Sequence, residues 1–188
     1  DGSETNYVRD VDGRVISITR DDPDGSGPLT APVTVYTYDA NGRRIQTVRP
    51  GGATESWSYD SLTGQRLTHT DVLGAVTTYA WNADRTLASV TDVSGGVTSF
   101  TYNGYGNVLT ETWPDPDGSG PDTSSVISYV RDAFGRATST TVAGITTSRT
   151  YDTVGRVTST TDALSHTTTY VWTDLGRLSS ITSPDPDG

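Results

Sequence analysis

Short segments in which β-branched or aromatic residues alternate with Thr or Ser recur along the chain. The segment 34–38 alternates strictly, and 45–48 does so more loosely. A period of two places successive side chains on opposite faces of a strand, and these residue types favour strands. Between the two segments, residues 39–42 have Asp first and Gly fourth, as in a type I turn closed by a left-handed Gly in a bulge. The pattern therefore predicts a β-hairpin.

The turn belongs to a cassette that occurs eight times: an aromatic residue or Arg, usually Asp, two variable residues, Gly, and usually Arg. The copies begin at residues 9, 38, 59, 81, 102, 131, 151 and 172, which gives spacings of 29, 21, 22, 21, 29, 20 and 21. A second Asp-x-x-Gly turn follows at 71–74 and 92–95, and 162–165 is a weaker match. A period near twenty residues indicates repeats that bury surface against their neighbours.

Each repeat thus supplies two strands and two turns, and we predict an all-β fold. Tandem β-hairpin repeats of ~21 residues would form one long antiparallel sheet of about sixteen strands. Because twisted sheets seldom exceed ~10 strands without curling or splitting, we expect this sheet to coil into a shell, a solenoid or a filament. Residues 1–188 are interpreted as a single array cut from a longer repeat protein, with acidic insertions at 21–28, 114–121 and 184–188.

Aromatic residues lie two positions apart in five of the expected strands, which puts both rings of a pair on one face. The pairs are Tyr36/Tyr38, Trp57/Tyr59, Tyr79/Trp81, Phe100/Tyr102 and Tyr170/Trp172. One face should carry this aromatic ladder and the other a Thr-rich surface. The rings either pack on neighbouring repeats in place of a core, or form a stripe that binds carbohydrate or peptide. The ladder runs the full length of the chain instead of clustering in one cleft, which favours the packing role.

The Asp and the Arg of the cassette are kept or lost together. Copies that keep both are Asp10/Arg14, Asp39/Arg43, Asp132/Arg136 and Asp152/Arg156, whereas Asn103/Asn107 and Asn82/Thr86 have lost both. Joint loss predicts that the two side chains interact, across a turn or between turns. Exposed pairs of this kind contribute about 0.2–1 kcal/mol each, so we interpret them as setting register and not as catalytic groups.

Composition excludes several classes of protein. The hydrophobic content is 32%, below that expected of an enzyme with a thick core, and the net charge of -10 argues against a nucleic-acid partner. Without Cys there is no disulfide or thiolate metal site. No apolar run approaches the ~20 residues of a membrane span. His69 and His166 lie in different repeats, and no nucleophile–His–Asp order or phosphate loop is present, so we expect no enzyme activity.

The acidic insertions are candidate calcium sites. Asp, Asp and Ser at loop positions 1, 3 and 5, followed by Gly, resemble the opening of a calcium loop, in which alternating oxygens converge on the ion. The candidate ligands are Asp22, Asp24, Ser26, Asp115, Asp117, Ser119, Asp185 and Asp187. Val33 and Val126 stand where the closing Glu belongs, so other oxygens must complete a site. The alternative is a solvated Asp/Pro/Gly turn that lengthens one hairpin. No other cofactor is expected.

The pattern Tyr-Asp-x-x-Gly-Arg, a Thr-rich strand and then Thr-Asp-x-x-Gly resembles the YD repeat of the RHS family. All eight copies match it in part or whole. That family includes Rhs toxins, shell components of Tc toxins, wall-associated proteins and teneurins. The resemblance implies β-hairpins that spiral into a hollow shell, which encloses a toxic segment in toxins and presents an extracellular surface elsewhere.

The expected function is a non-catalytic structural scaffold in an extracellular or secreted RHS-type protein, as a segment of a shell or filament. The alternative is a cell-surface adhesion or carbohydrate-binding module that uses the aromatic ladder. Expected partners are neighbouring repeats, or copies of the chain joined end to end through unpaired edge strands. An enclosed toxin segment or a cell-surface glycan is a further possible partner.

Overall fold

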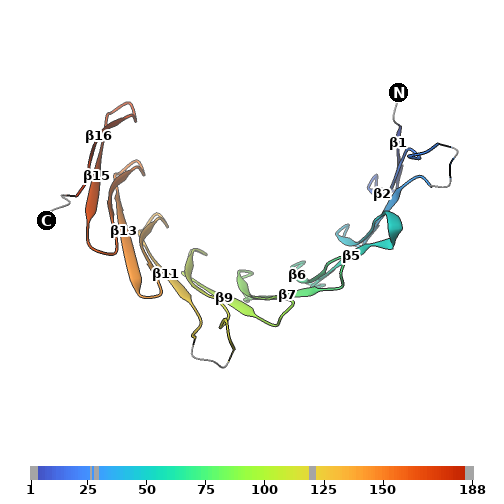
Figure 1. Cartoon of the computed structure of the whole chain (residues 1–188), viewed down its shortest axis with the longest axis horizontal. Helices are drawn as coiled ribbons and strands as arrows, with labels where there is room; N and C mark the ends of the chain where they lie inside the picture. The colour runs from blue at the N-terminus through green and yellow to red at the C-terminus, as the bar shows by residue number, and fades with distance from the viewer. Residues whose placement is uncertain (1–3, 26, 28–29, 119–121, 185–188) are drawn as a thin grey trace. The chain divides into compact units, whose positions relative to one another are not determined.

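The computed structural model describes residues 4–25, 27, 30–118 and 122–184. It contains sixteen β-strands whose order in the sheet is the order of the sequence (Figure 1). Every pairing among β1 to β7 and among β9 to β16 is antiparallel. The predicted all-β antiparallel hairpin array is therefore confirmed. The strands are β1 Thr5–Arg9, β2 Val15–Arg20, β3 Val33–Tyr38, β4 Arg44–Val48, β5 Thr54–Tyr59, β6 Arg66–Thr70, β7 Val76–Trp81, β8 Leu87–Thr91, β9 Val97–Tyr102, β10 Val108–Thr112, β11 Val126–Arg131, β12 Ala137–Val142, β13 Ile145–Tyr151, β14 Val157–Thr161, β15 Thr167–Trp172 and β16 Leu178–Thr182.

The cassette forms the turn that sequence predicts. In the β3–β4 hairpin, the Gly42 amide donates to the Asp39 carbonyl at 3.0 Å, and the Asp39 amide donates to the Arg43 carbonyl at 2.9 Å. The register shifts between Thr37 and Tyr38, which marks the bulge. Gly42 has φ of 78°, a left-handed conformation that Gly adopts at little cost. A Cβ at this position would also lie 3.1 Å from Nη1 of Arg14 in the preceding hairpin.

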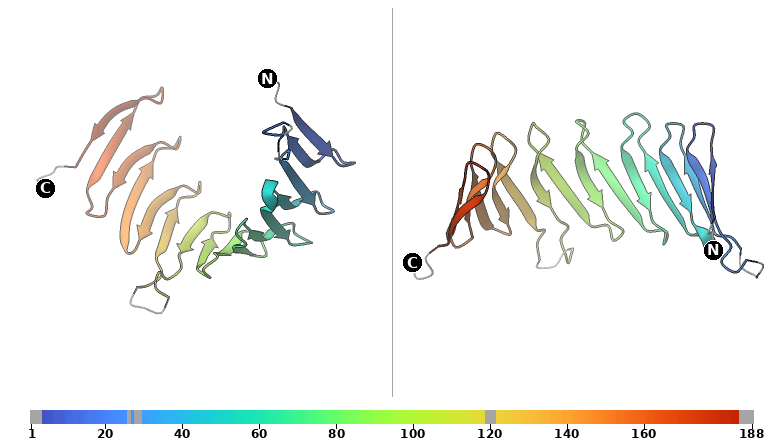
Figure 2. Two further views of the ribbon diagram at one scale, coloured as in Figure 1. Left: turned by 45° about the vertical axis from the view of Figure 1, so that its right-hand side comes forward. Right: turned by 90° about the horizontal axis from the view of Figure 1, so that it is seen from above.

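The chain divides into two compact units, residues 1–85 with 90–95, and residues 86–89 with 96–188. Within the first unit, β1 to β7 pair successively. Within the second, β9 to β16 do the same. In the second unit, the cassette turns lie at one end of the strands, and residues 113–118, which follow β10, lie at the opposite end (Figure 2).

Successive residues of a strand lie on two chemically different faces of the sheet. In β3, Thr34, Tyr36 and Tyr38 are half-buried, while Val33, Val35 and Thr37 are exposed. The registers place the paired residues Thr37 and Gln46 on the exposed face and the pair Tyr36 and Thr47 on the other. We call the face of Thr37 and Gln46 the hydroxyl face, and the face of Tyr36 and Thr47 the aromatic face.

No apolar side chain among the described residues is buried. The sheet is a single layer there, and its cohesion cannot come from a conventional core.

Candidate functional site

The repeated element in both units is the contact between one hairpin and the next, and it begins inside the cassette turn. The Asp39 carboxylate accepts hydrogen bonds from the Asn41 and Arg43 amides, both at 2.9 Å, and from Nε of Arg43 at 2.7 Å. The same Asp–Arg pair closes at 2.6–2.7 Å in the turns of Asp10, Asp132 and Asp152. The predicted interaction is thus present, and it lies across one turn.

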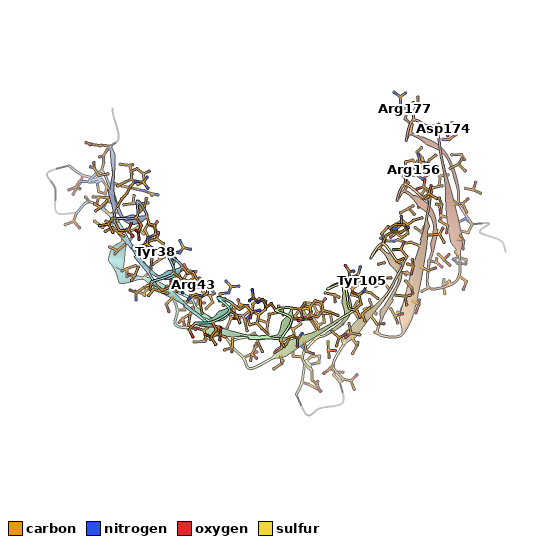
Figure 3. The ribbon with its side chains drawn as sticks, turned by 180° about the vertical axis from the view of Figure 1, so that it is seen from behind. Tyr38, Arg43, Tyr105, Arg156, Asp174 and Arg177 are labelled. Atoms are coloured by element: carbon orange, nitrogen blue, oxygen red, sulfur yellow. The ribbon has the colours of Figure 1, made fainter. Side chains whose placement is uncertain are left out.

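The guanidinium that closes a turn also reaches the following hairpin. Nη1 of Arg43 donates to the Asp60 carbonyl at 3.1 Å, and the guanidinium lies 4.8 Å from the centre of the Tyr59 ring. In the second unit, Nη1 of Arg136 donates to the Asp152 carbonyl at 3.3 Å. Figure 3 shows the Tyr38 and Arg43 side chains on one side of the first unit's sheet. Each such Arg is therefore shared between its own turn and the next.

In the six cassettes that open with an aromatic residue, that residue returns the contact. Its ring O–H or N–H donates to a carbonyl at the start of the second strand of the preceding hairpin. These bonds, 2.7–3.1 Å long, are Tyr38 to Val15, Tyr59 to Arg44, Trp81 to Arg66, Tyr102 to Leu87, Tyr151 to Ala137 and Trp172 to Val157. Neighbouring repeats do meet through the ladder, but through polar ring atoms and guanidinium groups. Among the described residues, Trp57 stacks on His69 with their ring centres 5.5 Å apart, within one hairpin.

A departure from the cassette supports this account. At residue 131 Arg replaces the aromatic residue, and its Nε donates to the Val108 carbonyl at 2.8 Å, as a Tyr or Trp does elsewhere. Its Nη1 donates to the Gly135 carbonyl at 2.9 Å. The preceding turn has Asn107 in place of the usual Arg, so a guanidinium still joins these two hairpins, but it comes from the later one. The sequence signal was the paired exchange at 107 and 131, which consensus matching ignores.

These contacts perturb the turn carboxylates. Burial by itself would raise the pKa of Asp132, but hydrogen bonds from the Arg136 side chain and backbone outweigh it and hold that pKa below its ordinary value. The pKa of Asp60 is also lowered, first by the Thr63 amide and then by the Thr63 hydroxyl. These carboxylates are therefore ionised acceptors fixed within turns, an arrangement that stabilises loops.

The two histidines occupy separate surroundings. Nε2 of His69 lies 2.9 Å from Oε1 of Glu55, whose other oxygen pairs with Arg49 at 2.8 Å. Nδ1 of His166 lies 3.1 Å from Asp162 within one turn. The pKa of Glu55 is lowered, first by the hydrogen bond from His69.

The calcium candidates are described only in part. Ser26, Ser119, Asp185 and Asp187 lie outside the described residues. Asp22 accepts from the Asp24 amide and Asp115 from the Asp117 amide, each at 3.3 Å, so both loops begin with the same local turn. Over the described part of the chain, no three His, Cys, Asp or Glu side chains gather as a metal cluster.

Known proteins share this architecture. The family model described as RHS Repeat matches residues 38–76 and 151–187. No curated protein matches the chain. No helix within the described ranges is long and apolar enough to cross a membrane.

Three solved structures illustrate the similarity of fold. A crystal structure of TcdB2-TccC3 matches 97% of this chain and 12% of its own, with 16% identity and a TM-score of 0.72. TcdB2-TccC3 without its hypervariable C-terminal region matches 96% of this chain and 11% of its own, with 16% identity and a TM-score of 0.71. The TcdB2-TccC3-Cdc42 structure matches 95% of this chain and 12% of its own, with 16% identity and a TM-score of 0.57. The chain thus spans about an eighth or less of these proteins, and at this identity the similarity establishes the fold.

Proposed function

We propose that this chain, which matches the RHS Repeat model over residues 38–76 and 151–187, is a non-catalytic structural scaffold, a segment of a β-sheet wall in an extracellular or secreted RHS-type protein. The observation that supports the proposal most directly is the repeated contact between hairpins. Ring donors reach the preceding hairpin and guanidinium groups reach the following one, as at Tyr151 and Arg136. Such contacts make each repeat depend on its neighbours, which suits an extended wall.

The wall could belong to a closed shell around a toxin segment or to a filament. We favour the shell, because the solved structures of similar fold include TcdB2-TccC3, one of them determined without a hypervariable C-terminal region. Electron microscopy of the intact parent protein tests this. Closed hollow particles would support the shell, extended fibres would support the filament, and compact solid particles would contradict both.

End-to-end association belongs to the same proposal. In the order of strands, β1 and β16 each have one neighbour, and every residue of both strands is exposed. Such edges can pair with further repeats or with another copy of the chain. Light scattering should then report particles that grow with concentration, and a monomer at all concentrations would contradict pairing between copies.

The adhesin alternative requires the aromatic ladder to be free for a glycan. The ladder rings are only half-buried, but their polar atoms are engaged between hairpins, as in the 2.7 Å bond from Trp172 to Val157. This engagement favours the scaffold over a glycan-binding stripe.

Calcium binding by the acidic loops remains a proposal. Several carboxylates in one short loop repel one another, and a divalent cation relieves that repulsion. Val33 and Val126 begin strands β3 and β11 with their side chains on the hydroxyl face, so neither offers a closing ligand. We therefore propose weak sites that fill outside cells.

A further inference from the structure

A cavity on the aromatic face of the first unit collects three arginines. Its volume is about 330 Å³, and its walls include Arg20, Arg44 and Arg49 together with Tyr36 and Thr47. The whole chain carries a net charge of -10. Three guanidinium groups around one hollow are therefore a local reversal of the protein's charge.

Two of these arginines stand where other repeats have an acidic or a neutral residue. The Arg49 amide donates to the Ala53 carbonyl at 2.8 Å, which is the bond that Asp71 makes to Ala75 in the next repeat. The Arg20 amide donates to the Pro32 carbonyl at 3.1 Å, which is the bond that Trp113 makes to Ser125 before the other long insertion. Arg49 therefore replaces an Asp and Arg20 a Trp, and both exchanges keep the backbone bond.

The third arginine replaces an apolar residue. Arg44 follows the cassette directly and offers its carbonyl to Tyr59, as Val15 does to Tyr38 and Val157 to Trp172. Its guanidinium lies 5.8 Å from the Tyr36 ring centre and 4.6 Å from that of Trp57. Each of the three arginines of the cavity is thus more positively charged than the residue at the equivalent position in other repeats.

The cavity has few anions of its own. Arg49 pairs with Glu55 at 2.8 Å, whereas Arg20 and Arg44 form no ion pair with any described residue. Thr47 is 4% exposed, and its hydroxyl has no hydrogen-bond partner in the described part of the chain. The two guanidinium groups without an ion pair are therefore the groups that an external anion could contact, while the buried Thr47 hydroxyl forms part of the wall.

We propose that this cavity binds an anionic monosaccharide unit, such as a uronic acid. The planar guanidinium fork matches a carboxylate with two parallel hydrogen bonds. The Tyr36 ring and the prolines in the wall give the sugar body an apolar surface. The volume lies at the lower end of the roughly 300–1,000 Å³ typical of small-molecule sites, which suits one sugar ring.

Calorimetric titration of the protein with sodium D-glucuronate tests the proposal, with D-glucose and inorganic phosphate as comparison probes. Glucuronate should bind at least tenfold more tightly than either, because only it has both the carboxylate and the ring. Glucose binding equally well would overturn the role of the charge. Phosphate binding equally well would overturn the role of the sugar, and absence of glucuronate binding would overturn the site.

Variants that restore the residue of other repeats keep the test independent of folding. Arg44→Val and Arg49→Asp should each weaken glucuronate binding about tenfold or more, as expected for loss of a charged hydrogen bond. Arg66→Val is the matched control, since Arg66 holds the position equivalent to Arg44 and offers its carbonyl to Trp81 but lies outside the cavity wall. Equal losses in Arg44→Val and Arg66→Val would contradict the proposal.

Discussion

Removing a single hydroxyl from the contact between hairpins should measurably destabilise the array. In Tyr151→Phe the ring stays, but the 2.8 Å hydrogen bond to the Ala137 carbonyl is lost. In Tyr151→Ala the ring that lies 4.6 Å from the Arg136 guanidinium is also lost. The two variants therefore separate the polar part of the contact from the part made by the ring.

The magnitudes follow from half-burial. A net hydrogen bond contributes about 0.5–1.5 kcal/mol, so we expect Tyr151→Phe to cost about 1 kcal/mol. Truncating a fully buried aromatic residue costs about 3–5 kcal/mol. Because Tyr151 is only half-buried, we expect about 2–3 kcal/mol for Tyr151→Ala. A double-mutant cycle with Arg136→Ala should give a coupling of about 0.5–1 kcal/mol, the range for an exposed cation–π pair.

Urea unfolding followed by circular dichroism supplies the measurement, and Trp fluorescence gives a second probe that shows whether the transition is cooperative. Tyr105→Phe is the control, because Tyr105 sits in a turn and is 88% exposed. Tyr105→Phe should change the free energy of unfolding by less than about 0.5 kcal/mol. If Tyr151→Phe and Tyr105→Phe were equally stable, the ring hydroxyls would not hold the hairpins together and the scaffold argument would lose its main support.

Three further predictions use the turns and loops. Ser165 has φ of 69° where equivalent turns have Gly, so Ser165→Gly should stabilise the protein by about 1 kcal/mol in thermal melts, and no gain would mean that this turn is unstrained. The pKa of Asp132 is lower in the folded state than in the unfolded state. The ionised carboxylate therefore stabilises the fold at pH values above the unfolded-state pKa of about 3.9, and this stabilisation is lost as the pH falls through the folded-state pKa. Asp132→Asn should therefore reduce the loss of stability in acid, measured by unfolding from about pH 5 to 2, and an unchanged acid profile would contradict this linkage. Excess calcium should raise stability by about 1.4 kcal/mol at ten times Kd, where Kd is about 10⁻⁴–10⁻³ M. Coincident calorimetric melts with calcium and with chelator, together with no effect of Asp115→Asn and Asp117→Asn, would identify plain solvated loops.

The hairpins could be read from the sequence because their causes are local. The alternation in 34–38 assigns each side chain to a face, and the Asp and Gly of 39–42 select the turn within four residues. The observed register and the φ of 78° at Gly42 follow from these short-range preferences. The sequence also showed that Asp and Arg of a cassette belong together, since they are lost together.

The partners between hairpins were decided by tertiary structure. Tyr38 meets Val15 across 23 residues only because the register of three strands places that carbonyl beside the ring oxygen. The same registers bring Arg20, Arg44 and Arg49 around one cavity. No local rule links these residues, because a contact across strands depends on cumulative strand pairing, and a slip of one residue would turn each side chain to the opposite face.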